Sequence, residues 1–303
     1  MDWTELDTWV VITASLFGIA CVLPGCFLLV GQQSMTSHGV SHAVLPGIVI
    51  AYLISGEVNT VYLLIGAVIS GICCVALSRT LERLSGVNAN AALGISFTSL
   101  FALGLILQRL CADHVHIEPS HVLFGDLEMA VVETVLFGVD SLDSIVWRAG
   151  LIALINLVAV ILLFKELRIA TFDPQHGDSV AARPQVTYYF LMILSSITAV
   201  MAFEAVGSIL VVAMMIIPPA IAFQLTSNLK LMMVIAVGVS VLTAGLGHWL
   251  SIQFFGSLFG GWFQLEATST SSAGSIAVTS GLLLVLTILI NKLLKKGTPQ
   301  ETP

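Results

Sequence analysis

Charged side chains are scarce in this sequence. Asp, Glu, Lys and Arg make up 10% of its 303 residues, whereas a soluble domain usually carries about 25%. Apolar residues make up 57%, and the mean hydropathy is +1.01. Because such a chain cannot cover itself with a solvated surface, lipid must be the solvent for much of it. The sequence also lacks a basic patch, and this excludes nucleic-acid binding.

Several catalytic and metal-binding motifs are absent as well. There is no Gly-x-x-x-x-Gly-Lys-Ser/Thr phosphate loop, so the chain cannot itself be an ATPase of that class. There is no His-Glu-x-x-His run, which an intramembrane metalloprotease would need. No Cys-x-x-Cys pair occurs, so neither a disulfide framework nor a zinc knuckle is indicated. The five cysteines lie in or beside apolar runs and are interpreted as small buried residues: Cys21, Cys26, Cys73, Cys74 and Cys111.

Long apolar runs dominate what is present. A membrane-spanning helix needs about 20 mostly apolar residues. Nine segments meet this condition, or eight if the short second one does not cross: roughly 9–30, 40–55, 61–78, 91–110, 145–164, 187–203, 207–225, 231–249 and 274–293. The connection 31–41 carries no charge and could dip into the membrane. The sequence therefore predicts an all-α fold, a polytopic transmembrane helical bundle of about nine spans.

The distribution of Lys and Arg predicts the orientation of this bundle, because cytoplasmic loops carry an excess of both. The segment before Trp9 is acidic and has no Lys or Arg, so it lacks the basic region of a signal peptide. With nine alternating spans, an external N-terminus places every basic residue except Arg109 and Arg148 on the cytoplasmic side. We therefore predict an N-out, C-in topology in which the first apolar segment stays in the mature protein.

Backbone-breaking pairs interrupt three predicted spans: Pro24-Gly25, Pro46-Gly47 and Pro218-Pro219. Carbonyl groups freed by proline are tolerated in lipid only where protein or a water-filled cavity satisfies them. The breaks therefore predict kinked helices around a central path, as in a transporter. Asn156 is interpreted as an interhelix hydrogen bond, and Gly66 as a point of close helix packing.

The most informative polar residues are two histidines near the start of the second span. On a helix, His38 and His42 are four residues apart and share one face. Two imidazoles on one face are half of a site for a borderline transition metal, and ionisable residues inside membranes are usually functional. The alternative is that both histidines bond to the backbone where the helix starts. Spacing alone leaves the two interpretations open.

Six stretches of the sequence resemble, in order, those of the ABC-3 family, the permeases of manganese, zinc and iron importers. The first stretch reads Ser-His-Ala-Val-Leu-Pro-Gly and has the form of the family's signature. The others resemble the fourth-span pattern, the external LFG loop, the internal FDP loop, the EAVGxLLV…IIP segment and a Gly-His pair in the eighth span. In this sequence the six lie at 41–47, 90–107, 121–128, 172–174, 204–218 and 247–248.

The resemblance implies one permease domain over 1–303, with an external tail at 1–8 and a disordered tail at 297–303. It implies that a cytoplasmic coupling loop at 165–186 docks into an ATPase subunit through Phe172, Asp173 and Pro174. Asp173 followed by Pro174 also has the form of a helix N-cap and first position.

The implied partners are that cytoplasmic ABC ATPase, an extracytoplasmic metal-binding solute-binding protein, and a second permease subunit. The second subunit would be a copy of this chain or a related one, and lipid would surround both in the bacterial plasma membrane. No cofactor is bound permanently, because the divalent Mn, Zn or Fe ion is the transported substrate.

The expected metal-site residues are His38, His42, His248 and Glu204. Glu204, at the outer end of the sixth span, could receive a cation or cap the next helix. His248, near the outer end of the eighth span, could face the path or be structural. The family usually has Asp where this chain has His38, and this exchange makes the pair softer and formally neutral.

Two other classes of transporter remain as alternatives. An ion-coupled secondary metal transporter would need carboxylates in the middle of the membrane, whereas only Glu204 and the acids at the loop borders are available. A permease of a siderophore or cobalamin importer would not need the histidine pair. The chain is therefore not expected to be an enzyme under any of these hypotheses.

Overall fold

The structure is a computed structural model that describes residues 3–33, 35–57, 60–111, 127–128, 131–132, 145–172, 184–255 and 271–296. Over these ranges the chain is helical and has no strand. The helices are α1 (Glu5–Val30), α2 (Met35–Ser55), α3 (Thr60–Ser85), α4 (Ala89–Cys111), α7 (Ile145–Leu162), α8 (Phe164–Phe172), α10 (Pro184–Leu225), α11 (Leu229–Leu250), the π-helical turn η1 (Ser251–Phe255) and α13 (Ser272–Lys296). They contain nine segments long and apolar enough to cross a membrane, two of them in α10. The predicted all-α fold and the count of nine spans are confirmed.

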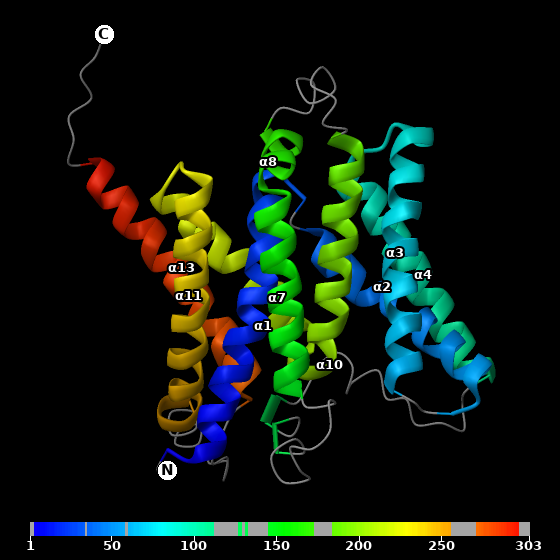
Figure 1. Ribbon diagram of the computed structural model, residues 1–303, viewed down its shortest axis with the longest axis horizontal. Helices are drawn as coiled ribbons and strands as arrows, with labels where there is room; N and C mark the ends of the chain where they lie inside the picture. The colour runs from blue at the N-terminus through cyan, green and yellow to red at the C-terminus, as the bar shows by residue number, and fades with distance from the viewer. Residues whose placement is uncertain are drawn as a thin grey trace.

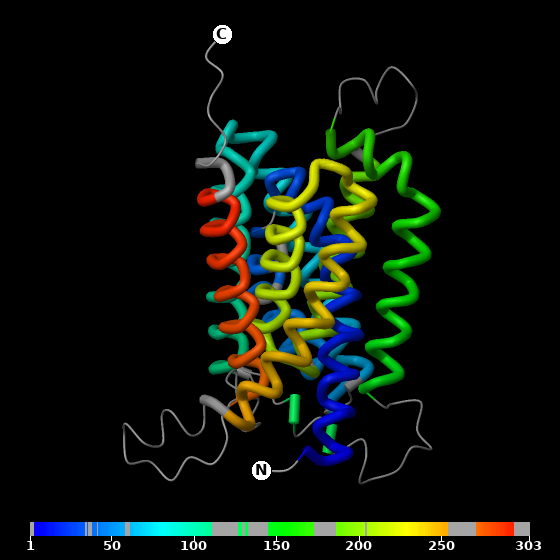
Figure 2. Tube along the Cα trace, turned by 90° about the vertical axis from the view of Figure 1, so that its left-hand side faces the viewer, coloured from blue at the N-terminus to red at the C-terminus, as the bar shows by residue number. Residues whose placement is uncertain are grey.

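The helices run roughly side by side, and α1 begins at the end of the bundle opposite to the one where α13 ends (Figure 1). Helices α1, α7 and α10 occupy the middle, with α2, α3 and α4 on one flank and α11 and α13 on the other. The view turned by 90° shows the long helices running between the same two ends of the bundle (Figure 2). Among the nine spans, α1 is the most buried and α4 the least.

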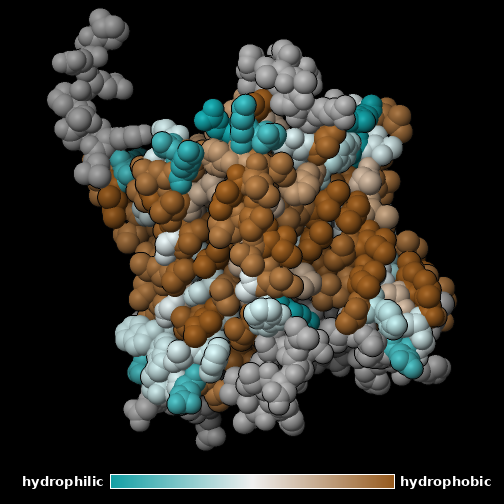
Figure 3. All heavy atoms as spheres, viewed as in Figure 1, coloured by the Kyte–Doolittle hydropathy of each residue, from teal (hydrophilic) through white to brown (hydrophobic). Residues whose placement is uncertain are grey.

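The surface carries the apolar band that a bilayer requires. Hydrophobic side chains cover the middle of the visible face, and hydrophilic ones gather at its two ends (Figure 3). Large apolar residues stand exposed on the outer helices, such as Ile161 at 65% on α7 and Val234 at 69% on α11. Exposed apolar surface on this scale is stable only against lipid or another subunit, so the chain is a multi-span membrane protein.

Two helices begin earlier than the sequence predicted. Helix α1 begins at Glu5 because Thr4 and Asp7 form a capping box, in which each side chain bonds to the other's backbone N–H. Residues 5–8, expected in an external tail, are therefore its first turn. Helix α2 begins at Met35, so most of the expected loop 31–41 is helical and the second span is long enough to cross.

The region of the predicted coupling loop also differs from a simple loop. Its first part continues from α7 as the short helix α8, and its last residues open α10. Phe172 is the final residue of α8 and is 58% exposed. Residues 173–183 and 297–303 lie outside the described part of the chain, so Asp173, Pro174 and the expected C-terminal tail do as well.

The break at Pro24 is satisfied by a neighbouring helix. Pro24 has no N–H, so the carbonyl of Ala20 loses its usual partner in α1. The Asn156 amide of α7 donates to that carbonyl at 2.8 Å and to the Thr198 hydroxyl of α10 at 2.8 Å. This confirms the interhelix role predicted for Asn156. The sixth and seventh spans meet within α10 at Gly207, whose φ of 76° and ψ of 161° redirect the chain.

Candidate functional site

The two histidines of α2 lie next to each other, as their spacing predicts. The centroids of the His38 and His42 rings are 4.8 Å apart, and the ring planes are 87° to one another. His38 is exposed and His42 is half-buried. Two imidazoles in adjacent turns, one open to the surroundings, can present two nitrogen ligands to one metal ion.

Helix α4 supplies an aromatic wall beside this pair. The ring of Phe97 stacks on His42 with a centroid distance of 5.8 Å and meets His38 edge-on at 6.0 Å. Phe101, one turn further along α4, meets His42 edge-on at 5.7 Å. Sequence reasoning did not identify these phenylalanines, although they repeat the four-residue spacing of the histidines. Together the four rings form a stripe between α2 and α4, which we call the histidine stripe.

Small residues hold α2 tightly against its neighbours. A side chain at Gly47 would clash with the carbonyl oxygen of Gly66 on α3, and one at Gly66 would clash with that of Gly47. The Ser70 hydroxyl donates to the Ala43 carbonyl at 2.5 Å. On the α4 side, a Cβ at Gly104 would lie 2.8 Å from the Pro46 nitrogen. These contacts confirm the close packing predicted at Gly66, and they fix the helix that carries the stripe.

His248 lies in a different part of the molecule. It lies in the last turn of α11 and is 2% exposed. Helix α11 is on the opposite flank of the bundle from α2 (Figure 1). Its Nδ1 is 2.8 Å from the Ser272 hydroxyl at the start of α13, and its Nε2 is 3.1 Å from a carboxylate oxygen of Asp7 on α1. The Ser272 hydroxyl and N–H both donate to Glu128. The structure therefore does not bring His248 together with His38 and His42.

Two further predicted sites are described only in part. The backbone of Glu204 lies on α10, three residues before the kink at Gly207, and its side chain lies outside the described part. Phe172 lines an open groove between α8 and the turn that joins α10 to α11. The groove is lined by Phe164, Arg168, Ile169, Phe172, Ser227, Asn228, Leu229 and Lys230.

Metal ligands are few in the part of the chain that the structure describes. No group of three or more His, Cys, Asp or Glu side chains there could hold an ion. The histidine stripe thus offers two ligands, whereas zinc sites in proteins usually have four. The methionines Met192, Met214, Met215 and Met232 are buried among core side chains, so they serve packing.

Comparisons with known proteins agree with one another over nearly the whole chain. A model of the ABC 3 transport family matches residues 4–291. The chain is 35% identical over 259 residues to the manganese transport system membrane protein MntD of Bacillus subtilis, covering 84% of this chain and 88% of that one. It is 36% identical over 282 residues to the zinc transport system membrane protein TroD of Treponema pallidum, covering 93% and 73%. The solved structure of PsaBC from Streptococcus pneumoniae in complex with Fab matches with a TM-score of 0.72 and 25% identity, covering 97% and 96%.

Proposed function

Because the chain belongs to the ABC 3 transport family, we propose that it is the membrane-spanning permease subunit of an importer for a divalent transition metal, Mn, Zn or Fe. As a multi-span helical member of this family, it is located in the bacterial plasma membrane. ATP hydrolysis takes place on a separate cytoplasmic subunit, and an extracytoplasmic binding protein delivers the ion. The metal is the substrate, and the chain itself catalyses no reaction.

The observation that carries this proposal is the histidine stripe. A dication crossing a bilayer must exchange water for protein ligands, and imidazole nitrogen suits zinc and iron, whereas manganese prefers oxygen ligands. The stripe offers two such ligands on a helix whose position is fixed by close packing. His38 is exposed at the surface of this chain, so we infer that a second permease subunit faces it and completes the ligand set.

The positions of Lys and Arg on the helices support an orientation of the chain in the membrane. Within the described residues, all Lys and Arg except Arg109 and Arg148 lie at the end of the bundle where α1 ends and α13 ends. An excess of basic residues marks the cytoplasmic side. We therefore propose that the N-terminus is external and the C-terminus cytoplasmic. This orientation puts α8 and its groove on the side where the ATPase docks, and it puts the start of α2 near the cytoplasmic surface.

Uptake of radioactive manganese, zinc and iron by cells tests the proposal. The His38→Ala/His42→Ala variant should lose uptake of the transported metal while its amount in the membrane stays normal. The matched control is Met35→Ala/Ile50→Ala, which removes two large exposed side chains from the same helix and should transport normally. Unchanged uptake in the histidine variant would exclude the histidine stripe as the metal site.

The rival mechanism, coupling to an ion gradient, is tested in vesicles. The proposal predicts that uptake stops when ATP is depleted, even with a proton gradient in place. Uptake that continues under these conditions would favour the secondary transporter instead.

A further inference from the structure

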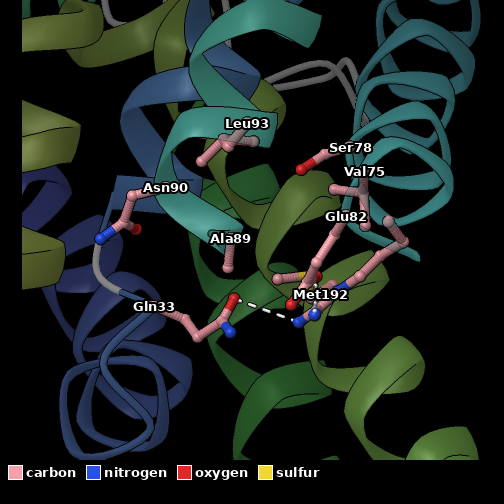
Figure 4. A pocket seen from close by; sticks show the side chains of 9 residues that line it. Gln33, Val75, Ser78, Glu82, Ala89, Asn90, Leu93 and Met192 are labelled. Atoms are coloured by element: carbon pink, nitrogen blue, oxygen red, sulfur yellow. Dashed lines mark hydrogen bonds and ion pairs between the residues drawn. The ribbon is translucent and has the colours of Figure 1, made fainter. Parts of the chain in front are cut away.

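A polar cluster at the predicted cytoplasmic end connects three helices that are distant in sequence. The amide oxygen of Gln33, in the connection between α1 and α2, accepts a hydrogen bond from the Arg79 guanidinium of α3 at 3.2 Å. The same oxygen accepts one from the Tyr188 hydroxyl of α10. Figure 4 shows the Gln33 side chain reaching across to this guanidinium. Both lone pairs of one oxygen are therefore used to connect the three elements.

Arg79 is held rigidly within this cluster. Its Nη1 is 2.5 Å from the Glu82 carboxylate in the next turn of α3. Its guanidinium carbon also lies 3.9 Å from the centre of the Tyr188 ring. An ion pair and a stacked ring leave the guanidinium little freedom, so its bond to Gln33 is preorganised.

The connection that carries Gln33 is rigid as well. The Gln33 N–H bonds back to the Leu28 carbonyl at 2.7 Å, and the Gly31 N–H bonds to the Phe27 carbonyl at 2.8 Å. Gln32 adopts a φ of 58°, which turns the chain sharply between the two helices. A displacement of Gln33 is therefore passed on to the last turns of α1, and Gln33 is two residues from the start of α2.

Two residues of this cluster lie near the two functional regions, the predicted coupling loop and the histidine stripe. Tyr188 lies in the first turns of α10, directly after the predicted coupling loop 165–186. Gln33 lies five residues before His38 along the chain. A small pocket beside Gln33 is lined by Arg79, Glu82, Asn90, Leu93 and Met192, among others (Figure 4).

Leu93 extends this pocket to the histidine stripe. A Cβ placed on Gly39 of α2 would lie 3.0 Å from Leu93, so the side chain of Leu93 abuts the turn of α2 between His38 and His42. Phe97, one turn along α4, already forms the wall of the stripe.

We propose that Gln33, Arg79 and Tyr188 form a coupling bridge, which transmits movement of the ATPase-docking loop to the helix that presents the metal ligands. The inference rests on the proposed function and adds positioning residues to it. When the loop moves, the start of α10 moves with it, and the bridge carries α2 along. Without the bridge, ATP is still hydrolysed, but α2 and the histidine stripe do not move in response.

The test uses the complete transporter, reconstituted in vesicles with its ATPase and binding protein. Metal uptake and ATP hydrolysis are measured in the same samples. Tyr188→Phe removes the hydroxyl and keeps the ring that stacks on Arg79, and Gln33→Leu removes the acceptor oxygen. Tyr188→Phe removes one neutral hydrogen bond and should lower the metal transported per ATP by roughly fivefold. Gln33→Leu also removes the bond from the charged Arg79 and should lower it by roughly tenfold or more. The rate of ATP hydrolysis should stay within about twofold of the wild-type rate. On a free-energy scale, that change is less than half of what one such hydrogen bond contributes.

Two controls separate coupling from structural support. Tyr189→Phe removes the neighbouring hydroxyl, which belongs to the ring beside Arg83 at 6.0 Å, and should leave the ratio unchanged. Gln33→Glu keeps an acceptor oxygen for the Arg79 and Tyr188 donors and should keep the wild-type ratio of metal transported per ATP. If Tyr188→Phe transports as much metal per ATP as the wild type, the bridge has no coupling role. If metal uptake and ATP hydrolysis fall in the same proportion, the coupling role is also overturned, because a purely structural role of the three residues explains that result.

A second readout judges the bridge without relying on transport. A fluorophore at Met35→Cys, in the first turn of α2 and 53% exposed, is attached after Cys73 and Cys111 are replaced by serine. ATP should change its emission in the otherwise wild-type complex and not in Tyr188→Phe. An equal change in both would refute the bridge. If the wild-type complex moves no transition metal but this nucleotide response depends on Tyr188, the proposed function fails and the bridge stands.

Discussion

Two regions of the molecule hold histidines within apolar helices, and they treat the imidazole rings differently. In the histidine stripe, His38 and His42 face phenylalanine rings and the surface of the chain. At the end of α11, His248 is 2% exposed, and each of its nitrogens is within hydrogen-bonding distance of an oxygen. The first arrangement places two imidazoles side by side at the helix surface, and the second uses one imidazole to join three helices.

The difference shows how to distinguish a ligand from a structural histidine inside a membrane. A buried polar group in lipid must be satisfied, and His248 is satisfied by Asp7 and Ser272 within this chain. His38 is exposed beside His42, where a metal ion or another subunit can reach it. We therefore propose that the transported ion binds at the histidine stripe and that His248 serves to join helices.

The largest effect is expected when a ligand is removed from the stripe. His42→Ala should lower metal uptake by about a hundredfold or more, because even second-shell changes at metal sites cost 10–100-fold. The purified protein should unfold at nearly the wild-type temperature, since His42 is only half-buried. Metal uptake by His42→Ala that stays within twofold of the wild type would mean that the histidine stripe, like His248, does not supply metal ligands.

The same truncation at the other region should act on stability. His248→Ala removes one hydrogen bond from each of Asp7 and Ser272 and opens a cavity beside Trp3, whose ring meets His248 edge-on at 5.6 Å. We expect the free energy of unfolding in detergent to fall by about 3 kcal/mol. Metal uptake per folded molecule should change little. A stable His248→Ala protein that has lost uptake would reverse the two assignments.

A smaller effect is expected at the contact that fixes the stripe. Gly47→Ala places a methyl group against the carbonyl of Gly66, and overpacking of this kind costs about 2 kcal/mol. Gly94→Ala on α4 is the matched control, because no heavy atom lies within 4 Å of its new Cβ. That change should be neutral or should stabilise by up to about 1 kcal/mol. Equal stability of the two variants would show that α2 and α3 do not pack this closely.

The smallest effect concerns the bond that replaces the one lost at Pro24. Asn156→Ala should destabilise the protein by about 1 kcal/mol, because the Ala20 carbonyl then has no donor. In a Pro24→Ala background, residue 24 regains an N–H for that carbonyl, so the same change should cost less. Thermal unfolding of the four proteins forms a double-mutant cycle. Strict additivity would contradict the link between Pro24 and Asn156.

Much of the fold could be predicted from the sequence, because it depends on local composition. Apolar length located the nine spans, and the spacing of His38 and His42 located the pair. Helix starts were less predictable, since the capping box at Thr4 and Asp7 lies just outside the apolar run. Contacts between distant segments could not be predicted. Asp7 lies 241 residues from His248, and Gln33 lies 155 residues from Tyr188.

The central claim is that the transported ion binds imidazole nitrogens of the histidine stripe. Zinc-edge X-ray absorption on the zinc-loaded, assembled transporter tests it most directly. The account predicts histidine scattering with zinc–nitrogen distances of about 2.0–2.1 Å, which disappears in His38→Ala/His42→Ala and persists in His248→Gln. Histidine scattering that survives in the double variant and vanishes in His248→Gln would contradict the account.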